Sequence, residues 1–250
     1  MQIDLSGKIA VVTGGSRGIG RETSLRLAEA GAQVVLNYHK SKEFAEGAWA
    51  EITRRGREAD LFQADIAQPE AVVALFEFIR KRHGRLDVLV NNAGITQDNL
   101  VLTMDLPNWD AVHAVNLRGA FLCTKAAAEM MLPQHSGKII NIASVGAIRG
   151  GRGQANYASS KGGLIAFTRA CAVELAKKGI QVNAILPGLI VTDMTDRIRR
   201  QRGEVLLGRI PQERFGEPAD VANLVVFLAS DRADYITGQA IPVDGGLSIA

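Results

Sequence analysis

The sequence has little of what a secreted or membrane-spanning protein needs. It contains only two cysteines, Cys123 and Cys171, which cannot form a disulfide framework or a four-ligand zinc site. The first apolar run follows the acidic Asp4 and is too short for a signal peptide or for a membrane span of about 20 residues. We therefore expect a cytoplasmic protein that uses no metal and no membrane.

The charge balance is equally uninformative about polymeric partners. Lysine and arginine number 29 against 26 acidic residues, a net charge of +3, which is too slight to predict binding to nucleic acid. Hydrophobic residues make up 47% and charged residues 22%, as in an average globular protein. Because no low-complexity linker or internal repeat interrupts the chain, we expect one domain over residues 1–250.

Short β-branched runs alternate with longer helical patterns along the whole chain. The expected strands span 9–13, 33–38, 59–65, 86–92, 138–144, 180–187 and 239–244, and the expected helices 18–30, 41–55, 69–83, 107–132, 155–178, 192–207 and 218–229. This alternation predicts an α/β fold: a Rossmann-type, doubly wound, mainly parallel seven-stranded sheet with helices on both faces. Ligands of such sheets bind at the carboxyl ends of the strands.

A glycine-rich turn joins the first strand to the first helix. Its residues Gly14, Gly15, Ser16, Arg17, Gly18, Ile19 and Gly20 are the candidates for holding a dinucleotide. Glycines allow the backbone to approach a pyrophosphate, and a helix N-terminus offers it unpaired N–H groups. The spacing Gly-x-x-x-Gly-x-Gly differs from the common Gly-x-Gly-x-x-Gly fingerprint, so a simple tight turn is the alternative.

The second strand lacks the acidic residue that usually binds a free ribose 2′-hydroxyl. It ends at Asn37, and Lys40 follows while Arg17 projects from the glycine-rich turn. Positive charge without a carboxylate suits a 2′-phosphate, so we expect NADP(H) with Asn37 and Lys40 among its contacts. The alternative is a solvated basic turn.

Two Tyr-x-x-x-Lys pairs could supply acid–base chemistry. Tyr38 and Lys42 straddle a strand end, where this spacing does not place side chains together, so we regard that pair as coincidental. Tyr157 and Lys161 open a helical pattern, in which residues four apart are neighbours. A neighbouring cation favours the phenolate, so we expect a lowered Tyr157 pKa, although a chance pairing of these residue types remains the alternative.

Two further polar residues occur where an active site is expected. Ser144 ends the fifth strand, from which its hydroxyl could bind a substrate carbonyl beside Tyr157; a plain turn residue is the alternative. Asn116 lies in an otherwise apolar helical pattern, where its amide must find partners and could hold a water or distort the helix. Taken alone, Asn116 is more often a structural residue.

Together these residues resemble the short-chain dehydrogenase/reductases over essentially the whole chain. The motifs are TGGSRGIG (13–20), Asp65-Ile66, NNAG (91–94), Asn116, Ser144, Tyr157-x-x-x-Lys161 and Pro187-Gly188. The resemblance implies catalytic roles: Tyr157 as general acid, Lys161 lowering its pKa and holding the ribose, Ser144 orienting the carbonyl and Asn116 serving a proton relay. It also implies cofactor contacts from Asp65, Ile66, Asn92, Ala93, Gly94, Pro187, Gly188, Ile190 and Thr192.

Within that family, several segments resemble the 3-oxoacyl-[acyl-carrier-protein] reductases of fatty acid biosynthesis. They are residues 95–100, 115–127, 155–176, 185–194 and 237–246. The resemblance implies NADPH-dependent reduction of a 3-oxoacyl thioester, on an acyl-carrier protein or CoA, to the 3-hydroxyacyl thioester. Residues 132–136 lack the basic residues that such reductases often present there. An NAD(P)-dependent enzyme of another small ketone, polyol or steroid, and a non-catalytic dinucleotide-binding regulator, are the alternatives.

The segment between Ser144 and Tyr157 bears on the substrate. Arg149 and Arg152 lie there among four glycines, and such a cationic rim suits a phosphate-bearing pantetheine carrier; a flexible, solvated turn is the alternative. The family resemblance also implies a homotetramer formed through the helices at 107–132 and 155–178. Their small residues would allow close approach, or would equally suit packing on the sheet: Ala158, Gly162, Ala166 and Ala170.

Overall fold

A seven-stranded parallel sheet forms the centre of the computed structural model, which describes residues 3–250. The strand order is β3-β2-β1-β4-β5-β6-β7, with the direction of winding reversing between β1 and β4. The strands are β1 (Ile9–Val12), β2 (Gln33–Tyr38), β3 (Ala59–Gln63), β4 (Val88–Asn91), β5 (Gly137–Ile142), β6 (Ile180–Pro187) and β7 (Ala240–Val243). The predicted doubly wound α/β fold is confirmed.

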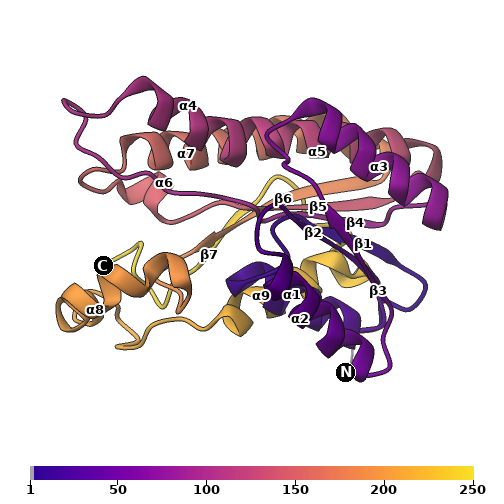
Figure 1. The fold of residues 1–250 in the computed structure, drawn as a ribbon, viewed down its shortest axis with the longest axis horizontal. Helices are drawn as coiled ribbons and strands as arrows, with labels where there is room; N and C mark the ends of the chain where they lie inside the picture. The colour runs from indigo at the N-terminus through magenta and orange to yellow at the C-terminus, as the bar shows by residue number, and fades with distance from the viewer. Residues whose placement is uncertain (1–2) are drawn as a thin grey trace.

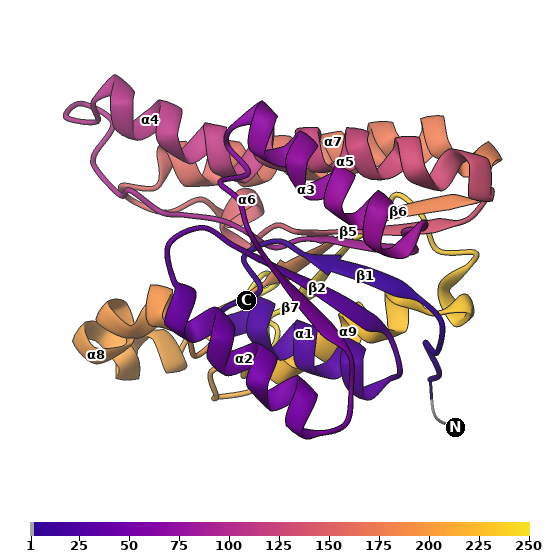
Figure 2. The ribbon, with the colours of Figure 1, turned by 45° about the vertical axis from the view of Figure 1, so that its right-hand side comes forward.

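Helices cover both faces of the sheet (Figures 1 and 2). On one face lie α1 (Gly18–Glu29), α2 (Lys42–Arg54) and α9 (Pro218–Ala229), and on the other α3 (Pro69–His83), α4 (Leu106–His113), α5 (Ala120–Met131) and α7 (Ala155–Leu175). The short α6 (Gly146–Arg149) follows β5, and α8 (Asp193–Leu207) extends away from the sheet. None of the described helices is long and apolar enough to cross a membrane.

Alternate residues of the strands enter two separate cores. Val12 and Leu36 pack with Leu25 of α1 and Val225 of α9 on one face. Val11 and its neighbours point the other way, into a core built with α3, α5 and α7. This period of two means that each strand buries both faces, which is why the strands appear in the sequence as continuous apolar runs.

The helix expected over 107–132 is not a regular α-helix. It divides into α4, a π-helical turn η1 (Ala114–Gly119), α5 and a 3-10 turn η2 (Leu132–Gln134). Asn116 lies in the π-helical turn and is 1% exposed, so the expected local distortion is present. The segment 145–154, expected to be loop, contains α6 because backbone hydrogen bonds such as Gly150 N to Gly146 O close a helical turn.

Candidate active site

A cleft of about 420 Å³ lies at the carboxyl ends of the strands. The predicted cofactor residues that line it are Gly14, Ser16, Arg17, Gly18, Ile19, Asn37, Lys40, Asp65, Ile66, Asn92, Ala93, Gly94, Pro187, Gly188, Ile190 and Thr192, together with Ser144, Tyr157 and Lys161. Gly15, Gly20, Asn116, Arg149 and Arg152 do not line it. The sequence therefore located most of the cleft wall.

The glycine-rich turn is shaped by backbone demands. Gly14 and Gly18 have φ of 63° and 51°, in the left-handed region that favours glycine. A Cβ on Gly20 would lie 2.2 Å from the Gly14 carbonyl oxygen, so Gly20 is needed for packing of the turn and not for a ligand contact. No described side chain caps the N-terminus of α1, which leaves its first N–H groups available to an anion.

Asn37 lies near the end of β2, the strand end at which the sequence lacks the usual acidic residue. It is 2% exposed, and its Oδ1 accepts from Gly14 N–H at 3.4 Å. Its Nδ2 donates to the carbonyl oxygens of Phe62 at 3.3 Å and Ala64 at 3.0 Å. The Asn37 amide thus ties the glycine-rich turn to β3. Asn37 is also one of the residues that line the cleft.

The basic side chains of Arg17, His39 and Lys40 line one part of the cleft. An Arg17 Nη1 lies 3.3 Å from Asp193 Oδ2, and the guanidinium lies 5.2 Å from the centre of the Phe44 ring. His39, which the sequence analysis missed, lines the cleft beside Lys40, with its Nε2 4.0 Å from Asp65 Oδ2. The signal that could have found His39 is its place directly after a buried parallel strand.

Tyr157 and Ser144 face the same end of the cleft. Ser144 follows β5, and its Oγ accepts from Gly146 N–H at 3.0 Å, which leaves its hydroxyl hydrogen to be donated toward Tyr157. Burial raises the pKa of Tyr157 above its usual value, while a hydrogen bond with Ser144 lowers it in part. Tyr157 is therefore a neutral phenol at pH 7, able to give a proton.

Lys161 lies four residues further along α7 and is 3% exposed. Its Nζ donates to the Ile142 carbonyl oxygen at 2.7 Å. Burial lowers the pKa of Lys161 to about 8. The expectation of a lowered Tyr157 pKa is wrong for this structure, because burial of the phenol dominates. The Lys161 ammonium donates to the Ile142 carbonyl oxygen, and its stabilisation of a Tyr157 phenolate stays a prediction.

Asn116 does not line the cleft, but it bonds the backbone of Ile95, which does. Its Oδ1 accepts from Ile95 N–H at 2.9 Å, and its Nδ2 donates to Ile95 O at 3.0 Å and to Ser160 Oγ at 3.1 Å. A Cβ on Gly94 would come within 3.3 Å of Asn116 Oδ1 and 3.4 Å of Lys161 Nζ. Asn116 therefore positions the 94–95 backbone, and its predicted relay role stays a prediction.

The second Tyr-x-x-x-Lys pair does not form a site. Tyr38 is 7% exposed and lies at the end of β2, whereas Lys42 begins α2 and its Nζ lies 3.6 Å from Glu46 Oε1. The expectation that this spacing is coincidental agrees with the arrangement.

Comparison with known proteins places the chain among oxidoreductases. A family model described as enoyl-(acyl carrier protein) reductase matches residues 14–248. The chain belongs to the short-chain dehydrogenase/reductase family. The 3-oxoacyl-[acyl-carrier-protein] reductase FabG of Staphylococcus aureus is 50% identical to it over 240 residues, which cover 96% of this chain and 98% of FabG.

Solved structures of similar proteins span the same range. A candidate gluconate dehydrogenase of Agrobacterium tumefaciens is 34% identical, with a TM-score of 0.97 and full coverage of both chains. A candidate NAD(P)-dependent gluconate 5-dehydrogenase of Beutenbergia cavernae, with NADP bound at low occupancy, is 38% identical, with a TM-score of 0.95 and full coverage of both chains. A nicotinamide cofactor follows from membership of this family.

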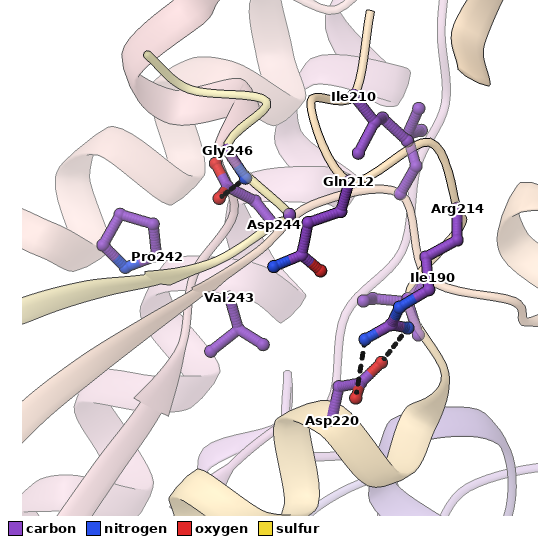
Figure 3. Close-up of a pocket in the computed structure, with 12 residues that line it drawn as sticks. Ile190, Ile210, Gln212, Arg214, Asp220, Pro242, Val243, Asp244 and Gly246 are labelled. Carbon is purple, nitrogen blue, oxygen red and sulfur yellow. Dashed lines mark hydrogen bonds and ion pairs between the residues drawn. The ribbon is translucent and has the colours of Figure 1, made fainter. Parts of the chain in front are cut away.

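A second pocket of about 370 Å³ lies behind Ile190 of this dehydrogenase fold (Figure 3). Arg214 Nη1 lies 2.7 Å from Asp220 Oδ2, and the Asp244 carboxylate accepts from Gly246 N–H at 3.0 Å. Figure 3 shows both carboxylates bonded to these neighbours. The residues around the pocket hold the segment that contains Ile190. Val191 N–H donates to Gly216 O at 2.8 Å, which ties this segment to the pocket wall.

The two arginines expected at the substrate rim of this reductase lie outside the cleft. The Arg149 Nη1 donates to the Leu247 carbonyl oxygen, which ties α6 to the C-terminal segment. Arg152 is exposed and forms no ion pair with any described residue. Contact of either arginine with a carrier phosphate therefore stays a prediction.

Proposed function

We propose that the chain uses NADPH to reduce a 3-oxoacyl thioester to the 3-hydroxyacyl thioester. The observation that carries this proposal is the convergence of Ser144, Tyr157 and Lys161 at one end of a cleft that a dinucleotide fits. Relatives about 50% identical over nearly their whole length and named as 3-oxoacyl-[acyl-carrier-protein] reductases support the substrate class.

The described residues fit a nicotinamide dinucleotide. The open N-terminus of α1 and the glycines at 14 and 18 suit the pyrophosphate, and Lys161 and Tyr157 suit the nicotinamide ribose. Asp65 and Ile66 border the adenine end, and Ile190 and Thr192 border the carboxamide end. When bound, the nicotinamide ring supplies the hydride that reduces the carbonyl carbon.

The protein's own groups complete the reduction at the carbonyl oxygen. Ser144, which bonds Tyr157 in the structure, donates its hydroxyl hydrogen to that oxygen when substrate is bound and so fixes the carbonyl beside Tyr157. The Tyr157 hydroxyl gives its proton to the same oxygen as hydride arrives at carbon, and the phenolate that remains is stabilised by the Lys161 ammonium four residues away. Hydride and proton together convert the ketone to an alcohol.

Preference for NADPH over NADH rests on the charges at the adenosine end. Arg17, His39 and Lys40 stand around the position of a 2′-phosphate, and the Asn37 side chain is committed to backbone groups and carries no negative charge. A phosphate gains charge-assisted hydrogen bonds there that a 2′-hydroxyl cannot make. We expect kcat/KM to favour NADPH by at least about tenfold, or ~1.4 kcal/mol.

An NADPH-oxidation assay against a panel of substrates tests the proposal. The panel contains acetoacetyl-CoA, an acetoacetyl carrier-protein conjugate, gluconate-derived ketones and simple neutral ketones, each with NADPH and NADH. We expect the two thioesters to give the highest kcat/KM. Turnover of simple or sugar ketones with no turnover of any thioester would contradict the proposal.

The second candidate is a dehydrogenase of another ketone or polyol. Structures about 34–38% identical that carry gluconate dehydrogenase names favour it, since they share the whole fold. The same panel separates the two candidates, because gluconate-type substrates contain neither a thioester nor a pantetheine arm.

We also propose a homotetramer. In α7, Ala166 and Ala170 are exposed, and Ala158 and Gly162 are half-buried, whereas Leu164, Thr168 and Cys171 face the sheet. Of the two arrangements that the sequence left open, the exposure of these small residues favours close contact between chains.

A further inference from the structure

Helix α8 rises from the rim of the cleft with little attachment to the rest of the chain. Its first turn is held by Thr192 and Thr195, which form a capping box, and this turn lines the cleft with Asp193 and Met194. None of the residues of α8 is buried. Figure 1 shows α8 standing apart from the sheet.

Apolar side chains of α8 continue outward from the cleft. Met194 is 52% exposed and Ile198, one turn later, is 39% exposed. Residues four apart lie on one helix face, so these two form a continuous apolar stripe that begins inside the cleft. A stripe in this direction could contact an extended substrate arm, with apolar and amide groups, that leaves the cleft.

Unpaired arginines flank this stripe. Arg197 and Arg202 are exposed, and neither forms an ion pair with any described residue, whereas Arg199 and Arg200 both pair with Asp196. At 1.5 Å per residue, Arg197 lies about 4.5 Å along the helix axis from Met194. Arg202 lies further from the cleft, at a kink in α8 where its backbone leaves the helical conformation (φ −141°, ψ 23°). Uncompensated guanidinium groups outside the cleft attract an anion.

From this arrangement we infer that Arg197 and Arg202 bind the phosphate of the pantetheine arm while the acyl thioester lies in the cleft. The inference rests on the proposed thioester substrate. In a pantetheine thioester the phosphate is at the far end of the arm from the reacting carbonyl, so its binding groups must stand outside the cleft. The Met194–Ile198 stripe leads from the cleft toward these arginines.

The test is the double charge reversal Arg197→Glu with Arg202→Glu. We compare KM for acetoacetyl-CoA, which carries the pantetheine phosphate, with KM for the N-acetylcysteamine thioester of acetoacetate, which has the same reacting group and no phosphate. We expect KM for the CoA thioester to rise about tenfold at low salt, with kcat and KM for the short thioester unchanged within twofold. KM for NADPH is measured in parallel and should not change.

A matched control reverses two other exposed, unpaired arginines, Arg54→Glu with Arg80→Glu. Arg54 ends α2 and Arg80 lies in the last turn of α3, and the variant has the same net charge as the test variant. We expect it to behave as the parent does, and Arg152→Glu measured beside it shows the separate contribution of the 145–154 segment.

The remaining outcomes decide against the inference. Equal KM rises for the two thioesters, a rise in KM for NADPH, or no change would each remove the phosphate contact from α8. A rise confined to a carrier-protein conjugate would assign these arginines to the carrier's protein surface instead. If the parent reduces no thioester at all, the proposed function itself fails, and that result is visible before any variant is made.

Discussion

At the scale of single residues, two opposing influences act on the Tyr157 phenol. Burial raises its pKa and the hydrogen bond with Ser144 lowers it. Burial has the larger effect, so the phenol keeps its proton until it is transferred to the substrate carbonyl oxygen. We expect Tyr157→Phe to lower kcat by about 10²–10⁴-fold, the usual contribution of a general acid. NADPH binding, measured by fluorescence titration, should stay within a few-fold of the parent. A Tyr157→Phe enzyme that keeps most of its kcat would contradict the assignment.

Lys161 makes stability depend on pH. Its pKa falls from 10.5 in the unfolded chain to about 8 in the folded chain. Between these values the unfolded state binds more protons, so the free energy of unfolding contributed by Lys161 rises with pH from about 8 to 10.5. Relative to Lys161→Met, the parent should therefore gain stability across this window in urea titrations. A constant difference between the two proteins would show that folding does not lower the Lys161 pKa.

Under the proposed NADPH preference, we expect Asp193 to compete with the 2′-phosphate for Arg17. The two side chains are 3.3 Å apart and largely exposed, so their pairing contributes at most about 1 kcal/mol. We expect Asp193→Asn to lower the Kd for NADPH about two- to fivefold and to leave the Kd for NADH unchanged. Asp196→Asn, whose carboxylate pairs within α8, is the control. Parallel shifts for both cofactors would exclude competition at the 2′-position.

At the scale of elements, residues with strong local rules were predictable. Helix α3 begins at Pro69 and ends before Gly84, whose φ is 72°, and the sequence analysis placed both ends correctly. The glycine-rich turn and the Tyr157 helix were found for the same reason. A distortion at Asn116 was predictable, but its π-helical form was not, because it depends on the hydrogen bond between Asn116 and Ile95, 21 residues earlier. The Lys161 contact with Ile142 is likewise a tertiary event.

Asn116 therefore tests whether the π-helical turn shapes the cleft. Asn116→Ala removes the partners of the Ile95 N–H and C=O groups, which are partly buried, and leaving them unpaired costs up to about 1–3 kcal/mol each, the value for fully buried groups. We expect a lower free energy of unfolding in urea and a raised Kd for NADPH. Asn108→Ala in α4, whose side chain makes no hydrogen bond with the described residues, should change neither. Loss of turnover at unchanged stability and Kd would instead support the relay role.

At the scale of the whole molecule, small and apolar residues are exposed along α7 and its neighbouring elements. This surface is formed by the exposed small residues of α7 and by neighbours from η1 and α5, including Phe121, which is 45% exposed. Contiguous exposed apolar surface marks an interface, and small residues let two helices approach closely. In light scattering the parent should have four times the chain mass of 26.8 kDa.

Ala166→Arg tests that assembly, because a charged side chain at the centre of the α7 stripe cannot be buried against a second copy without a partner. We expect the mass to fall to that of a dimer or monomer, with the fold retained in circular dichroism. Ala74→Arg, at an exposed position of α3 away from this surface, should leave the parent's mass unchanged. The cleft lies within one chain, so a dissociated Ala166→Arg protein should still bind NADPH. An unaltered mass for Ala166→Arg would place the contact between chains on another surface.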